Sequence, residues 1–237
     1  MNAFPKSAVE PRVFFEESIP ALFAEVELDD AERAITLRIG VVLTPEEHPG
    51  FQGEGGARGG EWTLSFADGE LDVSVGRSRE CDLTIVQRVS DWRSALWEGR
   101  PRLITDVVER IVSLGPEALR PEDMGRDGIR HPGTLEGFSD LQGLIEVVIS
   151  EQSDIAEAQD WKLGVYLGPG SIPESPQATI RLGAEQAEAM RRGELHPIEA
   201  LITGQLRLEG DLGLIIQLQA LAMQVSRSPP VSARGAV

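Results

Sequence analysis

Histidine and cysteine, two of the residues that most often perform catalysis, are few in this sequence, and their spacing matches no known catalytic or metal-binding arrangement. The three histidines, His48, His131 and His196, lie far apart and have no metal-ligand spacing. Cys81 is the only cysteine, which excludes an internal disulfide and a multi-cysteine metal site. No histidine lies near it in the sequence, so a structural thiol is favoured over a nucleophile. We therefore expect no metal site, and no catalytic residue can be named.

The glycine-rich segment 53–60 is the nearest approach to a phosphate-binding loop. Such a loop must lead into a helix, whose first backbone N–H groups hold the phosphate. Here a strand pattern beginning at Trp62 follows instead, so a hairpin loop is the favoured interpretation. No Gly-x-Ser-x-Gly elbow occurs, and no Gly-Lys-Ser/Thr follows a glycine loop. The sequence therefore predicts no cofactor.

Net charge excludes further classes of partner. Lysine and arginine number 22 against 39 aspartates and glutamates, a net charge of −17. Nucleic acids and anionic membranes are bound by clustered cations, so neither is expected as a partner. The longest apolar stretch near the C-terminus, 212–223, is too short to span a bilayer. Pro5 and Lys6 precede any apolar run, so we expect no signal peptide and a soluble, cytoplasmic protein.

Hydrophobic periodicity predicts an α+β protein. An amphipathic helix is expected over 13–23, and Asp68-Gly69 is a favoured hairpin turn. Ser90 is the expected N-cap of a helix that ends before Gly99. The strands predicted before residue 100 are 34–41, 62–66, 71–75 and 83–86.

The pattern is interrupted by a segment rich in glycine and proline between residues 114 and 139, and then begins again. The later strands are predicted at 144–149, 161–167, 178–182 and 206–208. The later helices are predicted at 185–192, from Pro197 onward, and at 212–223, where nearly all residues are apolar. The tail has no periodicity and is expected to be frayed.

The two passes are similar enough to indicate an internal duplication. Residues 62–66 match 161–165, both starting with tryptophan, and residues 83–85 match 178–180 around a shared threonine. The spacing of roughly one hundred residues is that of a domain rather than a short solenoid repeat. If the copies are related, residues 34–75 and 144–182 should form sheets with the same strand order.

The second copy resembles the sterol carrier protein 2 (non-specific lipid-transfer) family. The resemblance rests on 178–182, a helix to Gly193, a proline-initiated helix at Pro197, a Gly204-x-Leu-x-x-x-Gly-Asp211 strand, and the apolar helix after it. The resemblance implies a mixed or antiparallel sheet covered by helices, which enclose an apolar tunnel for sterols, fatty acyl chains or phospholipids.

With the duplication, the resemblance predicts two tandem sterol-carrier-like domains. Their expected bounds are 12–114 for a divergent first copy and 140–224 for the second, with a linker over 115–139 and a tail over 225–237. In the first copy, residues 106–114 have helical spacing where the family has its final strand. Whether this copy has a pocket of its own is therefore left open.

The predicted activity is the binding of an apolar small molecule such as a lipid, a fatty acyl chain or a sterol-like compound. Transfer of that molecule is the activity that the resemblance adds to binding. We expect the cavity between the sheet and the last helix of the second copy, lined by Val165, Ile180, Met190, Leu206, Leu208, Leu212, Ile215, Ile216 and Met223. For a residue of the last helix, ordinary core packing is an equal alternative, and for Met190 and Met223 core packing is the favoured role. Two other functions stay open: an enzyme that folds or cyclises an apolar intermediate in this cavity, and a scaffold that binds a partner protein or a second copy.

Overall fold

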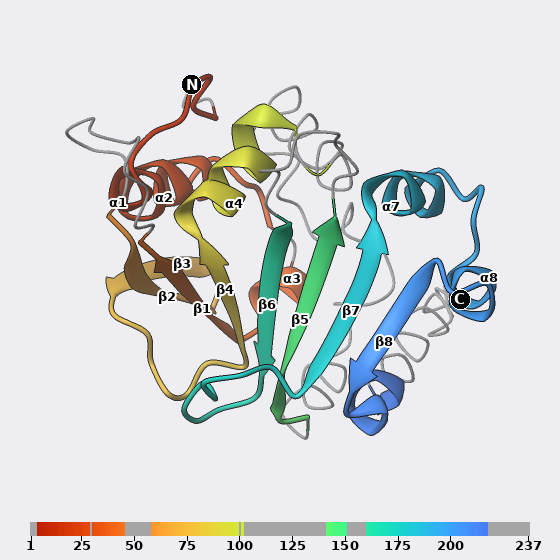
Figure 1. Ribbon diagram of the computed structural model, residues 1–237. Helices are drawn as coiled ribbons and strands as arrows, with labels where there is room; N and C mark the ends of the chain where they lie inside the picture. The colour runs from red at the N-terminus through yellow and green to blue at the C-terminus, as the bar shows by residue number, and fades with distance from the viewer. Residues whose placement is uncertain are drawn as a thin grey trace, which may run out of the picture.

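The computed structural model describes residues 4–28, 30–45, 58–99, 101, 141–150 and 160–217 (Figure 1). These residues form a mixed sheet of eight strands in the order β3-β2-β1-β4-β6-β5-β7-β8. The strands are β1 (Leu37–Thr44), β2 (Gly60–Ala67), β3 (Glu70–Val75), β4 (Leu83–Arg88), β5 (Gly143–Ser150), β6 (Trp161–Leu167), β7 (Ala178–Gly183) and β8 (Leu206–Gly210). The helical elements are α1 (Pro11–Val13), η1 (Phe14–Ser18), α2 (Ile19–Phe23), α3 (Asp30–Arg33), α4 (Val89–Arg93), η2 (Ser94–Glu98), α7 (Ala184–Arg191) and α8 (Pro197–Ile202).

Local sequence signals were accurate at turns and less so at helix starts. Asp68 and Gly69 have positive φ angles of 53° and 77°, as a two-residue hairpin turn requires. Gly99 ends η2 in the left-handed conformation. The prediction of Ser90 as an N-cap was wrong, because β4 continues to Arg88 and α4 begins at Val89. The predicted segments 106–114, 115–139 and 225–237 lie outside the described residues.

One face of the sheet is apolar along its whole width. Because side chains alternate across a strand, the paired rows place Trp62, Val41 and Ile85 on the same face as Val165 and Ile180. In the first half this face is covered by η1 and α4. Phe15 of η1 stacks on Trp62 of β2 with ring centroids 4.9 Å apart, and it also contacts Trp92 of α4. The Trp62 indole also donates to Glu16 Oε1, and this hydrogen bond is the main cause of a lowered Glu16 pKa.

The two halves of the sheet are paired in the same way. In the first half β1 lies between antiparallel β2 and parallel β4; in the second half β5 lies between antiparallel β6 and parallel β7. A helix directly follows the parallel neighbour in each half: α4 follows β4, and α7 follows β7. The two segments named in the prediction do not share a strand order: 34–75 holds β1, β2 and β3 in the order β3-β2-β1, whereas 144–182 holds β5, β6 and β7 in the order β6-β5-β7. The prediction was wrong for these segments, and the shared pairing is found only when β4 is taken in place of β3.

The register corrects the residue match on which the repeat was based. Trp62 stands opposite Val41, whose parallel neighbour is Ile85, whereas Trp161 stands opposite Ile149, whose neighbour is Leu182. When β4 and β7 are aligned on Thr84 and Thr179, Trp62 corresponds to Leu163. Gly60 takes the position of Trp161, and the Trp62 indole lies over it. The shift of two residues keeps both tryptophans on the apolar face.

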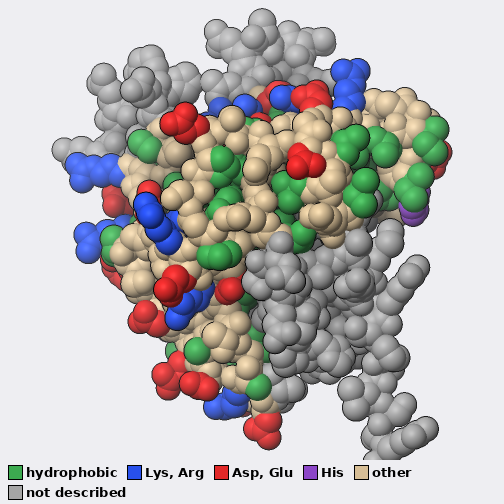
Figure 2. All heavy atoms as spheres, turned by 90° about the horizontal axis from the view of Figure 1, so that it is seen from below, with side chains coloured by type: hydrophobic (Ala, Val, Ile, Leu, Met, Phe, Trp, Pro, Cys, Tyr) green, Lys and Arg blue, Asp and Glu red, His purple; other side chains and the backbone are tan. Residues whose placement is uncertain are grey.

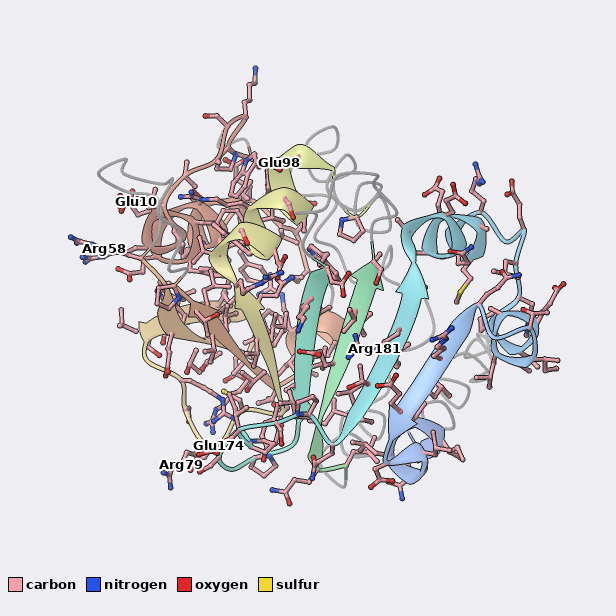
Figure 3. All side chains as sticks on the ribbon, viewed as in Figure 1. Glu10, Arg58, Arg79, Glu98, Glu174 and Arg181 are labelled. Atoms are coloured by element: carbon pink, nitrogen blue, oxygen red, sulfur yellow. The ribbon has the colours of Figure 1, made fainter. Side chains whose placement is uncertain are left out.

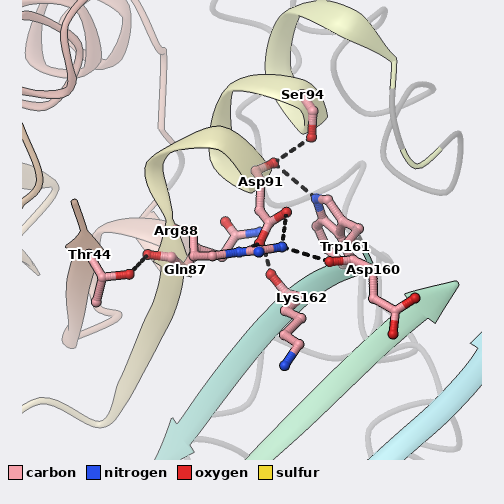
Figure 4. A network of polar contacts seen from close by, with 8 residues as sticks. All are labelled: Thr44, Gln87, Arg88, Asp91, Ser94, Asp160, Trp161 and Lys162. Atoms are coloured by element: carbon pink, nitrogen blue, oxygen red, sulfur yellow. Dashed lines mark hydrogen bonds and ion pairs between the residues drawn. The ribbon is translucent and has the colours of Figure 1, made fainter. Parts of the chain in front are cut away.

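The halves join into one sheet where β4 pairs antiparallel with β6, from Leu83 opposite Leu167 to Val86 opposite Gly164. A polar network continues this junction beyond the strands (Figure 4). Arg88 makes a two-point ion pair with Asp91, at 2.6 and 2.9 Å, and donates to the Asp160 carbonyl at 2.6 Å. The Trp161 indole donates to the Asp91 carbonyl at 2.9 Å. We call this set of residues the seam network.

Replacing Asp91 with asparagine should destabilise both halves together. Asp91 is only 6 % exposed, and breaking a buried ion pair typically costs about 3 kcal/mol because the remaining charge stays desolvated. The matched control is Arg38→Gln, which removes an exposed pair with Glu80 and should cost less than about 1 kcal/mol. Denaturant unfolding followed by far-UV circular dichroism gives both values. Equal losses for the two variants would contradict a structural role for the seam network.

Candidate functional site

The candidate site is an apolar cluster on the second half of the sheet, below the helical residues 212–217. Its buried members come from β5 and the residue Leu141 before it, from β6 and β7, and from the start of the last helix, and strands β4, β6, β7 and β8 contribute half-buried side chains. The buried residues are Leu141, Ile145, Leu167, Ala178, Leu214 and Ile215, and those packed against them are Leu83, Val165, Ile180 and Leu208. We call this set the aliphatic cluster.

The helix that covers the cluster is positioned by a hydrogen-bonding N-cap at Asp211 and by the lack of a side chain at Gly143. Asp211 Oδ1 accepts a hydrogen bond from the Leu214 backbone N–H at 3.2 Å, which satisfies one of the first free donors of the helix. Below it, Gly143 on β5 leaves room for Leu214: an added Cβ would lie 2.6 Å from Leu214 Cδ2. The helix therefore lies close to β5 because position 143 has no side chain.

Only one side of the described part of this helix is buried. Leu214 and Ile215 are each 6 % exposed, whereas Leu212 is 49 % and Ile216 63 % exposed. A helix that is apolar nearly all round is expected to be buried on most sides or to cover a cavity, and residues 212–217 are buried on one side only. Its exposed side needs a separate explanation.

The structure brings together four of the nine residues predicted to line a cavity: Val165, Ile180, Leu208 and Ile215 are all in the aliphatic cluster. Met190 packs in a neighbouring cluster around Ile149, Trp161 and Leu182, which Ile180 also contacts. Leu206 is half-buried and belongs to neither cluster, Leu212 and Ile216 are exposed, and Met223 lies outside the described residues.

Some cluster members were missed by the sequence analysis. Ile145, Leu167 and Ala178 follow the same two-residue alternation as Val165 and Ile180, so the strand pattern could have identified them. Leu83 could not have been identified this way, because it comes from the first half and reaches the cluster through the pairing of β4 with β6.

The aliphatic cluster contains no group suited to acid–base chemistry. The buried polar residues of the described chain are Thr63, Thr84, Gln87, Asp91 and Thr179, none of which belongs to it. Cys81 is fully buried, and burial raises the pKa of its thiol, so it stays protonated near neutral pH. The described residues hold no group of three potential metal ligands.

His196 has a structural role at the start of α8. Its Nδ1 accepts a hydrogen bond from the Ile198 backbone N–H at 3.2 Å and so caps α8, with Pro197 in the first turn.

Within the described ranges no helix is both long enough and apolar enough to cross a membrane.

Comparison with known families identifies a match in the second half. The model of the SCP-2 sterol transfer family matches residues 129–223, a range that contains β5–β8, α7, α8 and the aliphatic cluster apart from Leu83. This confirms the resemblance for the second half; residues 12–114 lie outside the match. No curated protein matches the chain.

Solved structures with some likeness include several sterol carriers. Sterol carrier protein 2 like 2 from Aedes aegypti aligns at 18% identity and a TM-score of 0.30, over 52% of this chain and 95% of its own. Sterol carrier protein 2 from Yarrowia lipolytica aligns at 12% identity and 0.28, over 36% and 75%. A conserved hypothetical protein from Thermus thermophilus, titled possibly a sterol carrier protein, aligns at 12% and 0.25, over 94% and 92%. At such TM-scores these likenesses do not establish a shared fold.

Two substitutions on the same helix should have very different effects. Leu214→Ala removes a side chain that fills the space above Gly143 and should cost about 3 kcal/mol, the usual loss for a buried leucine. Ile216→Ala removes an exposed side chain and should change stability by less than about 0.5 kcal/mol. The free energy of unfolding in urea measures both. A similar cost at the two positions would mean that the helix packs differently in solution.

Proposed function

We propose that this protein binds an apolar small molecule, such as a sterol, a fatty acyl chain or a phospholipid, against the aliphatic cluster of its second half. The observation that carries the proposal is the overlap of that cluster with the range matched by the sterol transfer family. Burial of the ligand's apolar surface supplies the affinity, at about 25 cal/mol per Å² removed from water. Of the nine residues named from the sequence, the proposed lining keeps Val165, Ile180, Leu208 and Ile215, which share the aliphatic cluster. It leaves out Leu212 and Ile216, which are exposed.

The proposal assigns binding to the second half because the first half has a different interior. There the apolar face is filled by a connected set of aromatic rings: Phe4, Phe14, Phe15, Trp62, Trp92 and Trp97. Large rigid rings in edge-to-face contact leave little freedom to open a space between them. The aliphatic side chains of the second half can adapt more easily.

We propose further that the chain is a tandem of two sterol-carrier-like units, 12–114 and 140–224. The shared pairing of β2-β1-β4 and β6-β5-β7 supports this. A second observation also supports it. If β4 corresponds to β7, then β6 pairs with the outer edge of β4 in the way that β8 pairs with the outer edge of β7. If β2 corresponds to β6, then β4 pairs with the outer edge of β6 in the way that β3 pairs with the outer edge of β2. Each unit thus supplies the outer strand that the other lacks, in one continuous sheet.

Among the alternatives, the described residues favour a binding protein over an enzyme. An enzyme needs ionisable or polar groups held inside its cavity, whereas the aliphatic cluster consists of leucine, isoleucine, valine and alanine. The scaffold alternative has one observation in its favour, namely the exposed apolar residues on α8 and on the last helix.

Two tryptophan variants test the location of the ligand. Ile180→Trp places an indole in the middle of the aliphatic cluster and should weaken binding of a fluorescent fatty acid by about tenfold or more, or 1.4 kcal/mol. Ile216→Trp places the same indole on the exposed side of the last helix and should leave binding unchanged. Circular dichroism and the melting temperature must show that both variants are folded, since overpacking costs about 1–3 kcal/mol.

If Ile180→Trp does not fold, Val165→Phe is the smaller substitution in the same cluster, with the same expected loss of binding. A folded variant that binds as the wild type does would place the ligand elsewhere. Native mass spectrometry of the wild-type protein supplies an independent measurement. A protein that carries no lipid and binds no apolar probe would overturn the proposed function.

A further inference from the structure

Strand β8 forms one end of the sheet, and no other described strand pairs with its outer side (Figure 1). Its inner side pairs antiparallel with β7, from Leu182 opposite Leu206 to Ala178 opposite Gly210. An unpaired edge carries free backbone N–H and C=O groups that can bind another strand. Proteins usually block such edges with charges or bulges, so the side chains of β8 decide what can pair there.

Those side chains are complementary to a second copy of the same strand. Arg207 and Glu209 lie on one face of β8, and Leu206 and Leu208 on the other. Antiparallel pairing around a two-fold axis at Leu208 sets each Arg207 opposite the second copy's Glu209. An axis at Arg207 or at Glu209 would place like charges opposite each other, and a shift of one residue would place Arg207 opposite Leu208 or Gly210, neither of which is charged. One register is therefore favoured.

Arg207 gains most from this pairing. Within one copy it stands directly opposite Arg181 on β7, a like charge. Figure 3 labels Arg181 on this strand. Glu209 pairs with Arg181 at 3.3 Å, while none of the ion pairs among the described residues involves Arg207. Pairing of two copies gives Arg207 a carboxylate neighbour twice, once in each copy.

Exposed apolar side chains flank β8 on both sides in sequence. Of the six large hydrophobic residues exposed in the described chain, five lie there: Ile198, Leu201 and Ile202 on α8, and Leu212 and Ile216 after β8. Figure 2 shows hydrophobic side chains on the surface beside the described histidine, His196, which caps α8. Such a concentration at one sheet edge is typical of a contact surface.

The same two-fold axis brings these two groups together. It sets Leu206 opposite the second copy's Gly210. Since α8 precedes Leu206 by a short turn and residues 212–217 follow Gly210, this pairing would put α8 of one copy at the same end of the paired strands as the other copy's last helix. Backbone pairing, charge order and exposed apolar surface therefore all fit one arrangement.

We propose that β8 is a homodimer interface, in which two copies pair antiparallel around Leu208 and extend the sheet across both. One five-residue strand and the apolar residues beside it form a contact at the small end of specific interfaces, so the dimer is reversible and concentration-dependent. The net charge of −17 makes two copies repel at low salt, and at 0.15 M ionic strength the screening length falls to about 8 Å.

Charge reversal tests the register. Arg207→Glu places glutamates opposite glutamates, and Glu209→Arg places arginines opposite arginines, so each variant alone should sediment as a monomer. Mixed in equal amounts, the two variants set a glutamate of one chain opposite an arginine of the other at both paired positions, and should form a heterodimer. Sedimentation velocity at 0.15 M salt, over a range of concentrations, measures each case. Arg79→Glu, an equal change of charge on the loop before β4, is the control and should dimerise as the wild type does.

A second pair of variants tests the apolar contact. Ile202→Ser removes the most exposed isoleucine on α8, at 80 %, and should shift the dimer to higher concentration without lowering the melting temperature. Val75→Ser is the control, because Val75 is 74 % exposed at the end of β3, on the opposite edge of the sheet. A wild-type protein that stays monomeric, a dimer unaffected by the reversals, or a mixture that does not associate would each overturn the proposal.

Discussion

Strand β4 is the element on which the rest of this structure depends, because it pairs with both halves of the chain. On one side it lies parallel to β1, and on the other antiparallel to β6. The Arg88–Asp91 ion pair and the Trp161 indole secure the same junction just beyond the strands. As a result the two apolar faces merge into one, and Leu83 from the first half packs against the aliphatic cluster of the second.

This junction also separates two kinds of interior. On the side of β1 and β2 the covering helices contribute phenylalanine and tryptophan, which lock together through edge-to-face contacts. On the side of β5 and β7 the covering residues are leucine and isoleucine, with glycine at the closest approach of helix and strand. A similar strand arrangement thus supports a rigid half and a more adaptable half, and the difference lies in the side chains rather than in the topology.

Much of this architecture followed from the sequence, because strands and hairpin turns are determined locally. The alternation in 62–66 and 71–75 and the Asp68-Gly69 turn specified β2 and β3, and the shared threonine aligned β4 with β7 correctly. The tryptophan match failed because a large ring can cover a neighbouring glycine. The indole of Trp62 lies over Gly60, two residues earlier on the same strand. The ring therefore covers the strand position that corresponds to Trp161, although Trp62 itself corresponds to Leu163. No local pattern could reveal that.

The candidate site was less predictable for a related reason. Val165, Ile180, Leu208 and Ile215 share a cluster because the strand register sets them side by side, and a pattern of alternating residues is sufficient to propose this. The exposure of Leu212 and Ile216 depends on how the helix is rotated about its axis. That rotation is set by the cap at Asp211, just before the helix, and by the missing side chain at Gly143, which lies far away in the sequence.

The position of β4 has a consequence for the order in which the chain can fold during synthesis. Residues 37–88 contain a complete four-stranded unit, but the outer edge of β4 finds its partner only when Trp161–Leu167 has been made. Until then the ribosome-bound chain carries an open strand edge, the kind of surface that leads to association of incomplete chains. Pairing across such a sequence separation is also slow, since a long loop must close first. The growing chain therefore passes through a stage in which chaperone binding to β4 would be most useful.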